Sequence, residues 1–123
     1  VDGAAGATQL VTLDELLQPW PGRIALLKMD IEGYEIDALR GATATLARCD
    51  RVLVEYSPAL LKRFGREPAE FFDLIRQAGL TFCIDHGGAL QRLDAAGVDA
   101  LLRSSADDPG FQQDLFCLRP EIG

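Results

Sequence analysis

The chain has 123 residues, of which 48% are hydrophobic and 25% are charged, and these values are ordinary for one globular domain. Its formal net charge of −7 at pH 7 argues against nucleic acid and anionic membrane surfaces as partners, because both require clustered Lys and Arg. No apolar run in the sequence approaches the roughly 18 residues that a membrane span needs.

The three cysteines, Cys49, Cys83 and Cys117, are widely spaced and form neither a CxxC pair nor a Cys/His cluster. This pattern indicates neither a zinc site nor a disulfide framework, and it favours the reducing cytoplasm as the location. The chain begins at Val1 without a Met or a basic segment, so its first residues do not have the pattern of a signal peptide. We interpret this start as a cut inside a longer protein, and we expect residues 1–8 to be flexible.

The first predicted elements are a short helix and a buried strand. Thr12 and Glu15 have the spacing of a capping box, which predicts a helix that stops before Pro19. Residues 24–29 are almost continuously apolar, as expected of a central parallel strand that is covered on both faces. From Tyr34 the apolar residues recur at helical spacing, which predicts one helix through residue 46.

The rest of the chain continues the alternation of strands and helices. Residues 51–56 are predicted as a strand, Pro68 as the first residue of a helix, and Gly79 as its stop. A third strand is predicted at 81–84 and a helix over 93–103 capped by Asp94. The last strand is predicted at 113–118. This order predicts one α/β domain over residues 1–123, with about four strands in a mostly parallel sheet flanked by helices.

Two acids follow the first predicted strand, at the sheet edge where open α/β proteins bind ligands. These are Asp30 and Glu32, and Gly33 permits a tight turn after them. Such acids can hold a hydroxyl or amine substrate, take up its proton, or share a divalent cation with a neighbour. The alternative is that both acids only cap the following helix. Nothing in the sequence sets a coordination number, so no metal site is predicted.

Four further residues are candidates for substrate binding. Lys28 interrupts the apolar run and either extends into solvent or pairs with an acid at the crevice. Glu55 and Tyr56 end the second strand and should lie beside Asp30, where paired carboxylates can shift each other's pKa. A structural salt bridge to Lys28 is the alternative for Glu55. His86, the single histidine, follows the third strand and is either an acid–base group or an exposed loop residue.

Taken together, these segments resemble the FkbM family of methyltransferases. The matching pieces keep their order and spacing, and they are Val11–Leu16, Leu26–Glu35 with its K-x-D-x-E-G-x-E pattern, Leu39–Ala42, Leu53–Glu55 and Asp114–Leu118. The resemblance implies the C-terminal portion of a Rossmann-like class I methyltransferase fold. Its last strand would run antiparallel, inserted between two neighbours.

The activity implied by the resemblance is methyl transfer from S-adenosylmethionine to a hydroxyl of a sugar or another small metabolite. Asp30 is then the candidate base, and Lys28, Glu32, Glu55, Tyr56 and His86 are candidates for substrate binding. The Gly-rich turn that would bind the donor is missing here, so a missing N-terminal half is an implied partner and the isolated chain is expected to be inactive. The alternative is a non-catalytic α/β module that binds a partner or a second copy through an exposed sheet edge.

Overall fold

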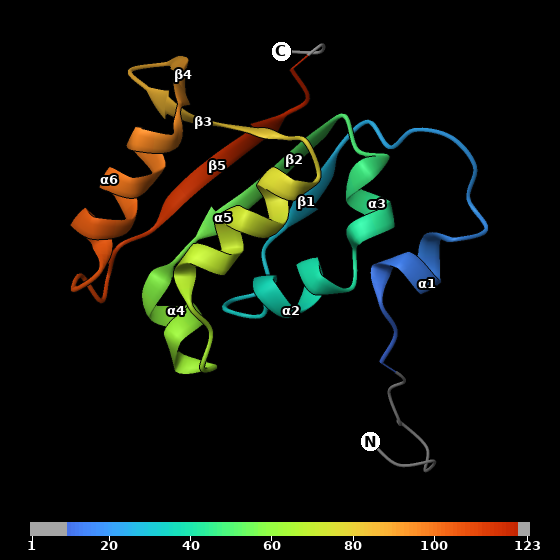
Figure 1. The fold of residues 1–123 in the computed structure, drawn as a ribbon, viewed down its shortest axis with the longest axis horizontal. Helices are drawn as coiled ribbons and strands as arrows, with labels where there is room; N and C mark the ends of the chain where they lie inside the picture. Colours follow the sequence, from blue (N-terminus) through green and yellow to red (C-terminus); the bar gives the residue numbers. More distant parts are fainter. Residues whose placement is uncertain (1–9, 121–123) are drawn as a thin grey trace.

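The computed structural model describes residues 10–120 as helices and strands, and the expected flexible segment 1–8 lies outside these residues (Figure 1). The helices are α1 (Leu13–Leu17), α2 (Glu35–Arg40), α3 (Thr43–Ala47), α4 (Pro58–Arg63), α5 (Pro68–Gln77) and α6 (Ala95–Ser105). The strands are β1 (Leu27–Met29), β2 (Arg51–Tyr56), β3 (Thr81–His86), β4 (Ala89–Leu93) and β5 (Gln113–Leu118). The α/β class is as predicted.

The strands form one mixed sheet in the order β1-β2-β5-β3-β4, with β5 between β2 and β3 (Figure 1). β1 pairs with β2 in parallel, whereas β5 pairs antiparallel with both β2 and β3. The inserted antiparallel last strand is therefore as the resemblance implied. Since β5 opposes both neighbours, β1, β2 and β3 run in one direction and their carboxyl ends meet at one edge.

The prediction of four mostly parallel strands was wrong in its count and its pairing. β4 is a fifth strand, paired antiparallel with β3, and β1–β2 is the one parallel pairing among the described strands. The reason is the pair Gly87–Gly88, which follows the third strand. Both residues have positive φ (65° and 89°), as required by the tight turns of β-hairpins, so the chain folds straight back.

β1 was predicted as a central strand covered on both faces, but among residues 10–120 it lies at the edge of the sheet and is shorter. Strand pairing covers Leu27–Met29, and Ile24 makes only an isolated bridge to Cys49. Met29 is buried, whereas Leu26 is 56% exposed. The apolar run did predict a strand here, but apolar residues do not specify which layers cover them, and the described residues leave more than half of Leu26 exposed.

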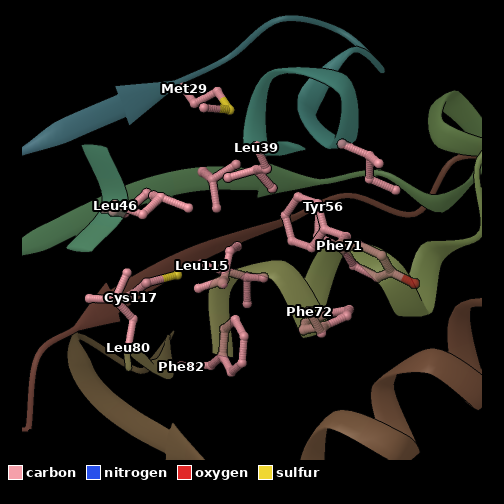
Figure 2. Packing of buried hydrophobic residues seen from close by; sticks show 14 of the residues in the cluster. Met29, Leu39, Leu46, Tyr56, Phe71, Phe72, Leu80, Phe82, Leu115 and Cys117 are labelled. Atoms are coloured by element: carbon pink, nitrogen blue, oxygen red, sulfur yellow. The ribbon is translucent and has the colours of Figure 1, made fainter. Parts of the chain in front are cut away.

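The core lies between the helices and one face of the sheet. Val52, Val54 and Tyr56 of β2 are buried, while Leu53 and Glu55 between them are only partly buried. Figure 2 shows Tyr56 beside Phe71 and Phe72 of α5, with Leu115 and then Cys117 of β5 farther along the sheet. Each fully buried large apolar side chain contributes about 1.5–3 kcal/mol to folding. The opposite sheet face, which carries Leu53 and Glu55, is left partly open.

Local sequence signals placed several helix ends correctly. The Thr12–Glu15 capping box is present, Pro68 begins α5, Gly79 follows it at φ 86°, and Asp94 caps α6. The single helix predicted from Tyr34 to residue 46 is instead two, α2 and α3, with a break at Gly41–Ala42.

The break between α2 and α3 has a tertiary cause. A Cβ atom on Gly41 would lie 2.8 Å from Cγ2 of Thr12, so α1 approaches closely here. From α1, the Asp14 carboxylate accepts hydrogen bonds from the backbone N–H groups of Ala44 (3.1 Å) and Thr45 (2.7 Å). These bonds cap α3 from another helix and stabilise its separate start.

Candidate functional site

Carboxylates from four neighbouring strands gather at one edge of the sheet. Asp30 directly follows β1, Glu55 is the penultimate residue of β2, and Asp85 is the penultimate residue of β3. β5 runs the other way, so its start lies at the same edge, and there Asp114 stands opposite Glu55 in the strand register. The edge is the one at which open α/β sheets bind their ligands.

Two adjoining grooves run along this edge on the open face of the sheet. The smaller has a volume of about 230 Å³ and is lined by residues of β1, β2 and β5: Lys28, Met29, Asp30, Leu53, Val54, Glu55 and Asp114. The larger, of about 380 Å³, is lined by Glu55, Asp85, Gln112, Gln113, Asp114 and Phe116. Glu55 and Asp114 line both grooves and therefore stand at their junction. Together the grooves offer carboxylates, two amides and an aromatic ring.

The surroundings of Glu55, at the junction of the two grooves, shift its pKa. Burial, followed by the negative charge of Asp30, raises the pKa of Glu55 above its ordinary value, and Asp114 and Glu32 add smaller effects in the same direction. The hydroxyl of Ser57, which donates to Oε1 of Glu55 at 3.3 Å, acts in the opposite direction. The neighbouring carboxylates therefore act on the pKa of Glu55 in the expected direction, and burial has the larger effect.

The turn after β1 is organised by Glu35 and not by Asp30 or Glu32. Tyr34 is the N-cap of α2 and makes no side-chain cap bond. Instead the buried Glu35 carboxylate accepts hydrogen bonds from the backbone N–H groups of Ile31 (3.1 Å) and Gly33 (2.8 Å). Helix capping was the alternative role for Asp30 and Glu32, but their exposed side chains make no hydrogen bond in residues 10–120. They are thus available to a ligand.

Lys28 lines the smaller groove with Asp30 and Glu55, and its side chain is exposed. No ion pair joins Lys28 to either acid among the described residues, so the structural salt bridge considered for Glu55 is absent there. The exposure agrees with the interpretation that Lys28 extends from the edge strand into solvent. Its ammonium group remains the one cation among the lining residues of the two grooves.

Two predicted site residues lie elsewhere. Tyr56 is fully buried, its hydroxyl lies 3.2 Å from Oγ of Ser105, and its ring packs on Phe71 and Phe72. Alternate residues of a strand face opposite sides, so Tyr56 points into the core while Glu55 faces the groove. For the same reason exposed His86 points away from the groove that Asp85 lines.

Asp85 and Asp114 were not identified as site residues from the sequence. Asp85 also accepts a hydrogen bond from the N–H group of Gly88 (2.9 Å), so it shapes the β3–β4 hairpin as well as the groove. Asp114 was detectable. Once the last strand is inserted between its neighbours, its second residue must fall beside the end of β2.

The described residues show neither a metal centre nor a Gly-rich nucleotide loop. In residues 10–120 no three His, Cys, Asp or Glu side chains are arranged to hold a metal ion. The consecutive glycines at 87–88 form the β3–β4 hairpin turn and do not lead from a strand into a helix. No helix within the same range is long and apolar enough to cross a membrane.

Comparison with known proteins gives one match. The family model described as the Methyltransferase FkbM domain matches residues 7–82. The match includes Lys28, Asp30, Glu32 and Glu55 and ends before Asp85 and Asp114, so the similarity noted for Asp114–Leu118 lies outside it. No curated protein and no solved structure matches the chain.

Proposed function

The chain belongs to the FkbM methyltransferase family, and on this premise we propose that it forms the acceptor side of an S-adenosylmethionine-dependent O-methyltransferase with a Rossmann-like fold. The proposed acceptor is a hydroxyl group of a sugar or another small metabolite. The observation that carries the proposal is the set of four carboxylates, Asp30, Glu55, Asp85 and Asp114, at one edge of the sheet. Carboxylates accept hydrogen bonds from hydroxyl groups, and several together suit a polyhydroxylated molecule.

In this proposal Asp30 is the base that takes the proton of the acceptor hydroxyl as the oxygen gains a methyl group. Its exposed carboxylate has no competing hydrogen bond in the described chain, so it can approach the acceptor directly. Glu55, at the junction of the two grooves, positions the acceptor with Asp85 and Asp114. Lys28 offers one ammonium group to an oxygen of the acceptor. Fixing donor and acceptor in line supplies much of the rate in such a reaction.

The described residues do not fit the donor by themselves, because they provide no Gly-rich turn at a strand end. S-adenosylmethionine would supply an electrophilic methyl group, and we propose that another part of the enzyme binds it. Two surfaces support this view. The open sheet face leaves Leu53 partly exposed, and the β1 side exposes Leu26, Ile31 and Tyr34 (39–56%). A donor-binding half would cover such surfaces, and we expect the isolated chain to be inactive.

Isothermal titration of the full-length protein with S-adenosylmethionine tests the proposal. We expect saturable heat of binding, and the same affinity within about twofold in Asp30→Asn, because Asp30 acts on the acceptor. The Cys83→Ala protein, altered in a buried β3 residue outside both groove linings, is a matched control. An absence of heat at millimolar donor would refute donor dependence.

A second candidate function is a non-catalytic module that binds a partner through the free edge of β1. The exposed backbone of an edge strand is a template for pairing, and Leu26 beside it is exposed. β1 has only three paired residues, which limits this mode. Size-exclusion chromatography at high concentration discriminates, because a monomer that binds the donor contradicts it.

We also propose a cytoplasmic location. Cys49, Cys83 and Cys117 are all free and buried, as is usual for thiols of proteins in a reducing compartment. Fractionation of cells that express the full-length protein checks this.

A further inference from the structure

The turn between β1 and α2 has an unusual backbone for its sequence. The N–H group of Tyr34 donates to the carbonyl oxygen of Ile31 at 3.3 Å, which closes a four-residue turn. The two central residues, Glu32 and Gly33, have φ values of 55° and 105°. Two consecutive positive φ angles are typical of type I′ turns, which favour Asn, Asp or Gly at both positions. Glu32 is the one non-glycine residue with positive φ in residues 10–120, so the chain holds a strained carboxylate residue here.

Two contacts hold this turn in place. The Glu35 side chain bridges it from inside, with Oε2 on the N–H group of Ile31 and Oε1 on that of Gly33. Gly33 packs so tightly on α4 that an added Cβ atom would lie 2.7 Å from Cε2 of Phe64 and 2.9 Å from the carbonyl oxygen of Leu60. The Phe64 ring also contacts the ring of Tyr34, with centroids 4.2 Å apart.

Glu35 is unusual in being a buried carboxylate, only 4% exposed, with no ion-pair partner among residues 10–120. Burying a charge is costly unless hydrogen bonds compensate it. The compensation comes from the two N–H groups of the turn, and bonds to a charged acceptor are about twice as strong as neutral ones. A neutral Gln of similar size has one acceptor oxygen in place of two and so cannot accept both bonds in the same way.

We propose that Glu35 is a positioning residue of the acceptor site: its buried carboxylate locks the strained turn and so fixes Asp30 beside Glu55 and Glu32 within the turn that follows. The three acids of this segment then have different roles. Glu35 never contacts the acceptor, and Asp30 and Glu32 depend on it for their place. The part that concerns the acceptor rests on the function proposed above, whereas the part that concerns the turn does not.

The test compares the full-length protein with its Glu35→Gln variant by two readouts that need no acceptor. Hydrogen exchange at the amides of Ile31 and Gly33 should become at least about tenfold faster, which corresponds to a loss of about 1.4 kcal/mol of protection. Carboxyl-carbon NMR should show the pKa of Glu55 moving down toward its ordinary value as Asp30 and Glu32 move away. Burial and Asp114 continue to act on Glu55, so the change is partial.

The Glu70→Gln variant is the matched control. Glu70 of α5 forms an ion pair at 2.6 Å with Arg40, which lies in α2 as Glu35 does. The pair is on the exposed side of α2, and Glu70 lines neither groove. It should leave both the two amides and the titration of Glu55 unchanged. Equal titration of Glu55 in the Glu35→Gln and Glu70→Gln proteins would overturn the proposal, as would unchanged exchange at Ile31 and Gly33.

A second variant, Glu32→Gly, tests the proposal even if the Glu35→Gln protein does not fold. Glycine adopts positive φ without strain, so the amides of Ile31 and Gly33 should stay protected while the pKa of Glu55 falls only by the contribution of Glu32. Loss of protection in this variant contradicts a lock made by Glu35. If the wild-type protein binds no S-adenosylmethionine, the proposed function fails, and these readouts still decide whether Glu35 positions the turn.

Discussion

Replacing Gly33 with alanine tests whether the turn that carries Glu32 is built on α4. At φ 105° an alanine pays a conformational penalty of about 1–2 kcal/mol. The new Cβ atom would also lie 2.7 Å from the Phe64 ring and 2.9 Å from the backbone oxygen of Leu60. Overpacking of this kind adds about 1–3 kcal/mol, because the backbone oxygen cannot rotate away. We therefore expect a loss of about 2–5 kcal/mol in the free energy of unfolding.

The matched control is Gly65→Ala. Gly65 also has positive φ (72°), but an added Cβ atom there meets nothing within 4 Å. Only the conformational penalty of about 1–2 kcal/mol applies, so the difference between the two variants isolates the packing of Gly33 on α4. Urea denaturation of the full-length protein, followed by circular dichroism, measures both. Equal losses in the two variants would show that Gly33 is not in close contact with Phe64 and Leu60.

Three further predictions concern single side chains. Tyr56→Phe removes the hydroxyl bonded to Ser105 and should cost about 1 kcal/mol of stability while leaving methyl transfer unchanged. A large loss of activity would show that Tyr56 is a site residue. Asp14→Ala should cost about 1 kcal/mol in thermal or urea unfolding by uncapping α3, and no loss would contradict the cap. The raised pKa of Glu55 means that the folded state binds its proton more tightly than the unfolded state, so this contribution to stability is present below the ordinary pKa of 4.5 and is lost as pH rises through the raised value. Glu55→Gln should therefore be more stable than the wild type in urea at pH 7 and equal to it near about pH 4, and a variant that is less stable at pH 7 would reverse this sign.

Features determined by local chemistry were predictable from the sequence. The bounds of β2 and β5 agree with the predicted strands at 51–56 and 113–118. The Thr12 capping box, Pro68 and Asp94 also mark helix starts where they were expected. In each case the signal lies within a few residues of the feature that it predicts, and here the tertiary contacts agree with it.

Features determined by contacts between distant segments were not predictable in this way. The break at Gly41 depends on the approach of Thr12, which lies 29 positions earlier in the sequence. The position of β1 at the edge of the described sheet depends on which strands pair with it, and an apolar run does not specify these. The Gly87–Gly88 hairpin is different, because paired glycines between two strand-length segments are a local signal of a tight turn. The prediction of a third strand at 81–84 did not use this signal.

Part of the candidate site could be predicted from the sequence. The ends of the first two strands gave Asp30 and Glu55, but treating Glu55–Tyr56 as one unit ignored strand alternation, which sends Tyr56 to the core. Asp85 was passed over in favour of its neighbour His86, which has more familiar acid–base chemistry but faces away from the groove. Glu35 was noted only as the last residue of the K-x-D-x-E-G-x-E pattern. The burial of Glu35, and with it its role in the turn, becomes visible only in the three-dimensional structure, where Gly33 packs on α4.

We propose that an enzyme containing this chain transfers a methyl group from S-adenosylmethionine with Asp30 as the base on the acceptor side. The most direct measurement is transfer of radiolabelled methyl groups to a panel of sugars and hydroxylated small metabolites by the full-length wild-type protein and its Asp30→Asn variant. We expect labelled product from the wild type and a rate lower by about 10²-fold or more in the variant, with donor affinity retained. Equal rates in the two proteins, or no labelled product from the wild type, would contradict the claim.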